Sequence, residues 1–210
     1  MTDIPNYERA FGGRPEAYAA WRALAAAISG GMDHRTYEIA TVAAARALRS
    51  TYCSLAHGEV LLERYADRDG LRALLAASDG VGVKADARRT EHTTGPDDTA
   101  TDGSTSFARA STSPMVTPDG ESLAADRDAA IAAFAARVAR DAPHIDDSER
   151  EALRAHGLSD ADIFDVILAV AARCFFSTVL DATGTRADAA YRERLPVDLV
   201  TELTCGREPL

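Results

Sequence analysis

Alanine dominates the apolar residues of this 210-residue chain, and aromatic residues make up only 6% of it. Alanine is the strongest helix former and its small side chain lets helices approach closely. Strands are instead enriched in β-branched and aromatic residues. The composition therefore predicts an all-α protein, a compact bundle of about six to eight helices.

The charge balance limits the partners of such a bundle. The formal net charge is -10, and Lys84 is the only lysine in the chain. Binding to a duplex or to an anionic bilayer needs a basic face, and the sequence shows no dense cluster of Lys or Arg. We therefore expect neither a nucleic acid nor a membrane as partner, and no segment looks long and apolar enough to cross a bilayer.

The chain has three widely spaced cysteines, Cys53, Cys174 and Cys205, and their number and spacing bear on the cellular compartment of the protein. An odd number at such spacing does not fit a disulfide-stapled secreted domain. The first residues show no basic stretch followed by an apolar run, as a signal peptide would. The expected location is the cytoplasm.

Apolar residues recur at helical spacing in most of the chain. Asp33 and Ser159 are expected to be N-caps, because each precedes a helical pattern with a side chain that can accept a backbone hydrogen bond. The longest apolar pattern should lie in the core or at a subunit interface. The predicted helices span residues 15–29, 34–50, 51–65, 71–77, 122–140, 147–155 and 163–183, with one or two short helices in the tail.

The composition changes at about residues 79–121. Within this segment, residues 93–106 contain Thr, Gly, Pro, Asp and Ser but no large apolar side chain. Such a stretch cannot bury enough surface to offset the entropy of ordering it. We predict a single domain over residues 1–210, with a flexible insertion at about 79–121 between two helical halves.

One group of residues can carry chemistry. Cys53 and His57 are four residues apart, a spacing that places two side chains on one face of a helix. An imidazole there can accept the thiol proton, and the helix N-terminus favours the thiolate, which is the reactive form. Glu38, on the preceding helix, can orient the imidazole if the two helices pack as an antiparallel pair. We predict Cys53, His57 and Glu38 as the catalytic residues.

The spacing of Glu38, Ser50, Cys53 and His57 resembles a known motif. In the alkyl hydroperoxidase D-like branch of the carboxymuconolactone decarboxylase family, eleven residues separate a Glu from a Cys-x-x-Cys motif, and three residues separate that motif from a His. The run at residues 157–163 and the apolar helix after it also look like this family. The resemblance implies the helical bundle of that branch, a homo-oligomer (trimer or hexamer), and a peroxidase-type antioxidant oxidoreductase without a cofactor.

Ser50 departs from that motif, because it stands where the family has the first cysteine of the pair. The resemblance implies that the cysteine matching Cys53 attacks the peroxide and that its partner resolves the product as a disulfide. A serine cannot do so, and an external thiol or a distant cysteine would have to. Cys174 is one candidate, and Tyr52, Ser50 and Cys174 are the candidate pocket residues.

Three functions stay open at this point. The first is thiol-dependent reduction of a small hydroperoxide with a thiol reductant. The second is an acid–base lyase acting on a small carboxylated substrate, as in the decarboxylase branch, with His57 and Glu38 dominant. The third is a helical scaffold or binding protein without catalysis. A metal site formed by His34, Glu38, Cys53 and His57 is not expected, because the spacing fits no structural zinc pattern.

Overall fold

The structure is a computed structural model that describes residues 4–64, 68–88 and 120–210, and these ranges contain helices and no strand. The predicted all-α class is confirmed. Ten α-helices occur in these ranges rather than about six to eight: two short helices of 5 and 7 residues lie in the tail, where one or two were predicted, and a 5-residue helix near the start of the chain was not predicted. The elements are α1 Asn6–Ala10, α2 Pro15–Gly31, α3 His34–Ala47, α4 Thr51–Arg64, α5 Arg68–Arg88, α6 Gly120–Asp141, a 3-10 turn Ala142–His144, α7 Asp147–Ala155, α8 Asp160–Ala182, α9 Ala190–Arg194 and α10 Val197–Leu203.

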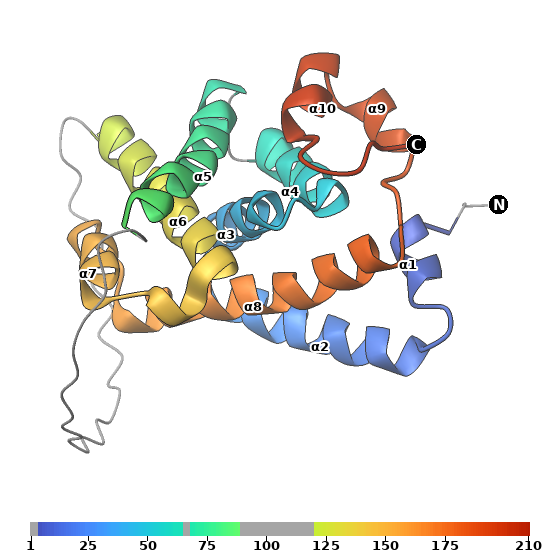
Figure 1. The fold of residues 1–210 in the computed structure, drawn as a ribbon, viewed down its shortest axis with the longest axis horizontal. Helices are drawn as coiled ribbons and strands as arrows, with labels where there is room; N and C mark the ends of the chain where they lie inside the picture. Colours follow the sequence, from blue (N-terminus) through green and yellow to red (C-terminus); the bar gives the residue numbers. More distant parts are fainter. Residues whose placement is uncertain (1–3, 65–67, 89–119) are drawn as a thin grey trace.

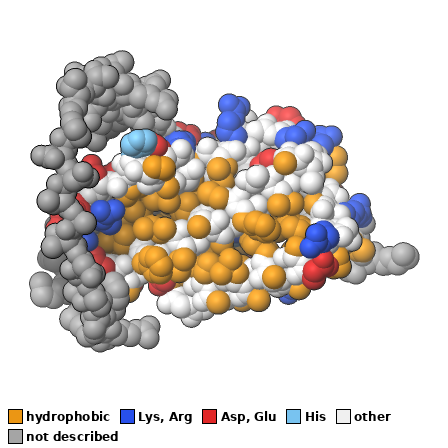
Figure 2. Space-filling model, turned by 60° about the horizontal axis from the view of Figure 1, so that its bottom comes forward, with side chains coloured by type: hydrophobic (Ala, Val, Ile, Leu, Met, Phe, Trp, Pro, Cys, Tyr) orange, Lys and Arg blue, Asp and Glu red, His pale blue; other side chains and the backbone are white. Residues whose placement is uncertain are grey.

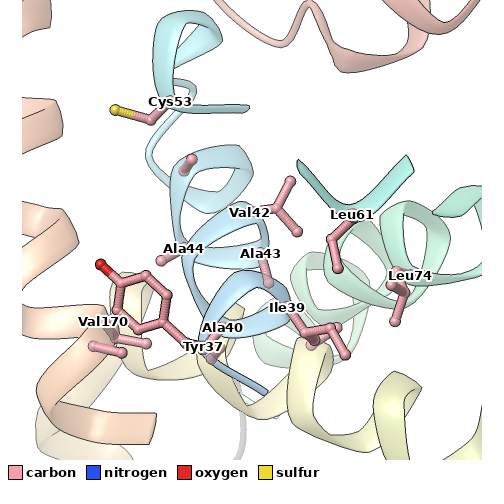
Figure 3. Packing of buried hydrophobic residues seen from close by; sticks show 14 of the residues in the cluster. Tyr37, Ile39, Ala40, Val42, Ala43, Ala44, Cys53, Leu61, Leu74 and Val170 are labelled. Carbon is pink, nitrogen blue, oxygen red and sulfur yellow. The ribbon is translucent and has the colours of Figure 1, made fainter. Parts of the chain in front are cut away.

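Helix α3 is the centre of the bundle. Its residues 36–45 are all buried, and it packs against α4, α5, α6 and α8 (Figure 1). A helix buried on every side needs small side chains, and alanine fills much of this stretch. Figure 3 shows Val42, Ala43 and Leu61 of α4 within this packing. A polar side chain on α3 is therefore in the core unless it lies near the ends.

Helices α3 and α4 form a tight pair. The Asp33 carboxylate caps α3 by accepting a hydrogen bond from Thr36 N at 2.8 Å, as predicted. Between the helices, Arg49 takes a left-handed conformation with φ 59°, so the chain reverses within three residues. Gly206 packs against this turn, where an added Cβ would lie 1.9 Å from the Arg49 carbonyl oxygen. The turn therefore brings the first turn of α4 beside the C-terminal segment.

Helix α8 runs beneath α3 in Figure 1, next to α2. Ser159 and Asp162 form a capping box at its start, which confirms the predicted N-cap. The expectation that no segment could cross a membrane is wrong for α8, which is long and apolar enough by length and composition, although half of the relevant window is buried in the protein. A core helix of a bundle has the same composition. The cytoplasmic location stays a prediction.

Helix α5 is longer than the sequence pattern indicated. We predicted a short helix over residues 71–77, whereas α5 continues to Arg88 and includes the first ten residues of the expected insertion. Isolated glycines cost a helix only about 1 kcal/mol each, and good helix formers follow them here. Residues 89–119 lie outside the described residues, and so does the prediction of a flexible segment there.

One face of the molecule is broadly apolar (Figure 2). It lies on the side of α2 and α8, which carry the exposed side chains Leu24, Phe164 and Phe175 at 51%, 58% and 47% exposure. In α2, Ile28 is the one buried residue. Isolated exposed apolar residues are common, but a continuous area is more typical of an interface. The homo-oligomer stays a prediction, and this face is where we expect its contacts.

Candidate functional site

Glu38 and His57 form a buried pair between α3 and α4. Glu38 Oε2 lies 2.6 Å from His57 Nδ1, and the two side chains are 6% and 15% exposed. An ionised carboxylate can only accept hydrogen bonds, so Nδ1 is the donor and the lone pair of Nε2 is left to accept a proton. The other carboxylate oxygen lies 3.7 Å from Nε2 of His34, whose side chain is 43% exposed. The carboxylate thus stands between a buried and an exposed imidazole.

Cys53 lies one turn before His57 on α4 and is 1% exposed. Its sulfur accepts a hydrogen bond from Arg173 Nη1 of α8 at 3.5 Å. A guanidinium is always charged in proteins. The fold therefore places a positive charge against the Cys53 sulfur.

Arg173 is itself buried, at 4% exposure. Its guanidinium carbon lies 5.9 Å from the Trp21 ring centre and 5.6 Å from that of Phe176, and these two rings stack 4.0 Å apart. Its Nε has no hydrogen-bond partner, and within the described ranges it forms no ion pair with a carboxylate. A buried cation is unfavourable unless an anion balances it. The Cys53 sulfur is the group in contact with it that can supply the negative charge.

Tyr37 completes the surroundings of the sulfur. In Figure 3 its hydroxyl and the Cys53 sulfur point to the same side of α3, the side on which Val170 of α8 lies. The Tyr37 ring meets the His57 ring edge-on at 6.2 Å. Burial raises the pKa of Tyr37, while the nearby Arg173 guanidinium opposes the shift. Tyr37 is therefore a neutral hydroxyl that lies beside the Arg173 guanidinium.

The imidazole of His57 is tuned toward its neutral form. Burial lowers the pKa of His57, and the charge of Arg173 lowers it further, whereas the hydrogen bond to Glu38 works in the opposite direction. A neutral imidazole whose Nδ1 is held by a carboxylate is a proton acceptor at Nε2. The site thus combines a thiol, a base, an orienting carboxylate and a fixed positive charge.

Comparisons with known proteins point in the same direction. Residues 15–87 match the sequence model of the carboxymuconolactone decarboxylase family. This segment contains Glu38, Cys53 and His57 but not Arg173. Residues 15–87, about a third of the chain, are therefore similar to this family. The resemblance inferred from the spacing of Glu38, Cys53 and His57 is confirmed.

Two solved structures share the fold of this chain. One is an alkylhydroperoxidase AhpD core, an uncharacterized peroxidase-related protein from Ralstonia eutropha JMP134, with a TM-score of 0.57 and 21% identity over 92% of this chain and 83% of that one. The other is an uncharacterized peroxidase-related protein from Silicibacter sp. TM1040, with a TM-score of 0.54 and 20% identity over 91% and 80%. No curated protein gives a significant match. At this identity the likeness shows a common fold, the predicted alkyl hydroperoxidase D-like bundle.

The three candidate pocket residues lie in different surroundings. Ser50 is fully buried before α4, and its hydroxyl has no hydrogen-bond partner. The Tyr52 hydroxyl donates to Asp188. Cys174 follows Arg173 on α8, half-buried, and burial raises its pKa. Successive helical residues point about 100° apart, so Cys174 does not share the direction of Arg173. The pocket roles of Tyr52 and Cys174 stay predictions.

Metal binding gains no support from the geometry. In the part of the chain that the structure describes, no group of three or more His, Cys, Asp or Glu side chains is placed to hold a metal ion. His34 and His57 both point to Glu38, which uses the carboxylate for hydrogen bonds within the protein. The chemistry considered below uses only side chains of the chain itself.

Arg173 is the site residue that the sequence reasoning missed. It is the one charged residue between Asp165 and Asp181, in the middle of the most apolar helix. A charge at the centre of an apolar segment is costly unless it has a function or a partner. That contrast was visible in the sequence, but only the fold reveals that α8 brings Arg173 to Cys53, 120 residues away.

Proposed function

We propose that this protein is a thiol-dependent oxidoreductase that reduces small hydroperoxides at Cys53. The observation that carries the proposal is the contact of Arg173 with the Cys53 sulfur at 3.5 Å in a buried site. A guanidinium without a carboxylate partner stabilises the neighbouring thiol as its thiolate. The thiolate is the nucleophile that attacks peroxides.

The reaction uses each residue of the site in turn. His57 takes the thiol proton at Nε2, and Glu38 holds the imidazole in that tautomer. The thiolate attacks the terminal oxygen of RO–OH, the O–O bond breaks, and Cys53 becomes a sulfenic acid. The alkoxide that leaves takes the proton back from His57. Sulfur loses two electrons in this step and the peroxide gains them.

Regeneration of Cys53 needs an external thiol, because Ser50 cannot form a disulfide. One thiol condenses with the sulfenic acid to a mixed disulfide and releases water, and a second thiol releases Cys53. Cys53 is 1% exposed, whereas the His57 side chain is 15% exposed. Substrates must therefore be small and reach the sulfur past His57.

The test is peroxide consumption with a thiol reductant by the purified protein and by Cys53→Ser. We expect the variant to lose turnover entirely, since serine is not nucleophilic enough to replace the thiolate. Cys174→Ser and Cys205→Ser are matched controls, and turnover should persist in both. Full turnover in Cys53→Ser would disprove the proposal.

A lyase acting on a carboxylated substrate is the second candidate, and the same contact gives it some support. The Arg173 guanidinium can bind a carboxylate, and the Glu38–His57 pair can move a proton. This function does not need the sulfur. A Cys53→Ser variant with unchanged lyase activity, together with a wild-type Cys53 that peroxide does not oxidise, would favour it. Unchanged behaviour of Cys53→Ser, His57→Gln and Glu38→Gln in every assay would leave the scaffold hypothesis.

A further inference from the structure

Unpartnered polar atoms gather around Cys53. Among the described residues, the buried side-chain nitrogen and oxygen atoms without a hydrogen-bond partner are Arg173 Nε and the hydroxyls of Ser50, Ser54 and Ser177. All three serines are 0% exposed. Native proteins satisfy most buried polar groups, so each exception needs an explanation. Here the exceptions belong to α8 and to the start of α4, the two segments that meet at Cys53.

The spacing on α8 places Ser177 opposite the first turn of α4. Arg173, Ser177 and Asp181 follow at intervals of four residues and share one helix face. At one end of this row Arg173 contacts the Cys53 sulfur. At the other end Asp181 faces Ser50. Ser177 therefore lies between Arg173 and Asp181 on this face of α8.

Ser54 differs from the other two serines in its direction. It lies beside the Cys205 thiol of the C-terminal segment, which packs on the start of α4. It follows Cys53 directly and so points about 100° away from it on the helix. Ser54 is thus an equally buried hydroxyl that lies beside Cys205 and does not face the site.

We propose that Arg173 Nε, Ser177 and Ser50 form a seat for the two oxygen atoms of the hydroperoxide, a role that rests on the function proposed above. All three are hydrogen-bond donors. None of them makes a well-formed hydrogen bond within the described residues, although the Asp181 carboxyl group lies beside the Ser50 hydroxyl. Negative charge develops on the leaving oxygen as the O–O bond breaks. Donors that are already in place stabilise this charge without reorganisation.

The same geometry indicates the charge of the substrate. Asp181 stands at the Ser50 end of the seat, and burial raises the pKa of its carboxyl group. A second carboxylate placed there would be repelled and poorly solvated. A neutral hydroperoxide fits the seat, whereas a substrate with its carboxylate at this position does not.

Two reagents that attack the same sulfur separate the seat from general activation of the thiol. Hydrogen peroxide delivers oxygen atoms, and iodoacetamide alkylates the thiolate without an O–O bond to stabilise. The oxidation of Cys53 is followed by trapping the sulfenic acid with a 1,3-dione and by peptide mass spectrometry. The variants are Ser177→Ala and Ser50→Ala, with Ser54→Ala as the matched control.

We expect Ser177→Ala and Ser50→Ala each to slow oxidation by peroxide about tenfold, since each removes one hydrogen bond to a charged oxygen. Alkylation by iodoacetamide should stay at the wild-type rate in both. Ser54→Ala should change neither rate. The thermal midpoint should not fall in Ser177→Ala, whereas Ser50→Ala and Ser54→Ala each remove a hydroxyl that lies beside Asp181 or Cys205 and should lower it slightly.

Two results would overturn the seat. If Ser177→Ala and Ser50→Ala are oxidised as fast as Ser54→Ala while wild-type Cys53 forms a sulfenic acid, the seat is wrong and the peroxidase function stands. If alkylation slows in parallel with oxidation, the serines act on the thiolate and not on oxygen. A wild-type Cys53 that resists peroxide but alkylates normally would refute the peroxidase function, and the seat with it.

Discussion

Helices α3 and α8 each bring one buried charge to the site, and the two charges are balanced in different ways. Glu38 on α3 is 5% exposed and has His57 and His34 as partners. Arg173 on α8 is 4% exposed and lies against a thiol and two aromatic rings, and no carboxylate of the described residues pairs with it. The first charge is satisfied by the fold. The second charge contacts the sulfur that the proposed function uses as nucleophile, which links the burial of this charge to the proposed chemistry.

This difference implies opposite costs for removing the two charges. A carboxylate that is hydrogen-bonded to an imidazole contributes to the stability of the fold, because its loss leaves the partner buried and unsatisfied. A buried cation without an anion is a burden on stability, and replacing it by an apolar side chain of similar length is often neutral or stabilising. Arg173 is therefore expected to be kept for reactivity, and Glu38 for both reactivity and stability.

The largest effect that tests this comparison should come from Arg173→Met. We expect Cys53 to react with iodoacetamide at neutral pH about 10- to 100-fold more slowly, since a hydrogen bond to a charged group is worth about 1.5–3 kcal/mol. The thermal midpoint should stay the same or rise. Arg173→Lys is the control, because it keeps the charge but not the planar fork.

If the thermal midpoint of Arg173→Met fell by many degrees while the alkylation rate of Cys53 stayed the same, Arg173 would not be a residue kept for reactivity. Arg173 would then be a structural residue that packs on Trp21 and Phe176. Partial recovery of alkylation in Arg173→Lys would instead confirm that the positive charge is what the sulfur requires.

A smaller loss is expected for Glu38→Gln. The amide cannot hold His57 as an anion does, so the imidazole is a poorer proton acceptor and peroxide turnover should fall about tenfold. Unlike Arg173→Met, this variant should also lower the free energy of unfolding. The measurement pairs turnover with urea unfolding of the two variants. If Glu38→Gln and Arg173→Met changed the free energy of unfolding equally, the two buried charges would not differ in what they contribute to stability.

His34→Gln serves as the control for that variant, because it lies on the solvent side of the same carboxylate, 3.7 Å away. It should change turnover less than Glu38→Gln does. An equal loss of turnover in both variants would mean that the contact of Glu38 with His34 matters as much for turnover as its contact with His57.

The contrast between the two helices also explains what the sequence could reveal. Glu38, Cys53 and His57 lie within twenty residues on α3 and α4, so their helical spacing predicts the contact between Glu38 and His57. The caps Asp33 and Ser159 are local signals too, and both predictions are confirmed. Local patterns determine these features, and they are readable without the fold.

Arg173 and the seat depend on long-range packing. No local pattern tells which face of α8 meets α4, so neither the partner of Cys53 nor the position of Ser177 follows from spacing. The end of α5 was also misplaced, since glycines near residue 80 suggested a stop that the helix tolerates. Composition predicts that a segment is apolar and helical, but not which of its residues faces a thiol.

The smallest expected effect is the pH dependence that His57 gives to stability. The pKa of His57 in the folded protein is lowered, chiefly by burial, from an ordinary value of about 6.5. Above that value the imidazole is neutral in both states and contributes nothing. Below it the unfolded chain binds a proton that the folded protein does not, so the free energy of unfolding falls as the pH drops toward the folded pKa. Urea unfolding between pH 7 and pH 5 should show this fall, and His57→Gln should make it shallower. If the free energy of unfolding depended on pH equally in both proteins, His57 would bind its proton as readily in the folded protein as in the unfolded chain. His57 would then not be the neutral base that Glu38 is proposed to orient.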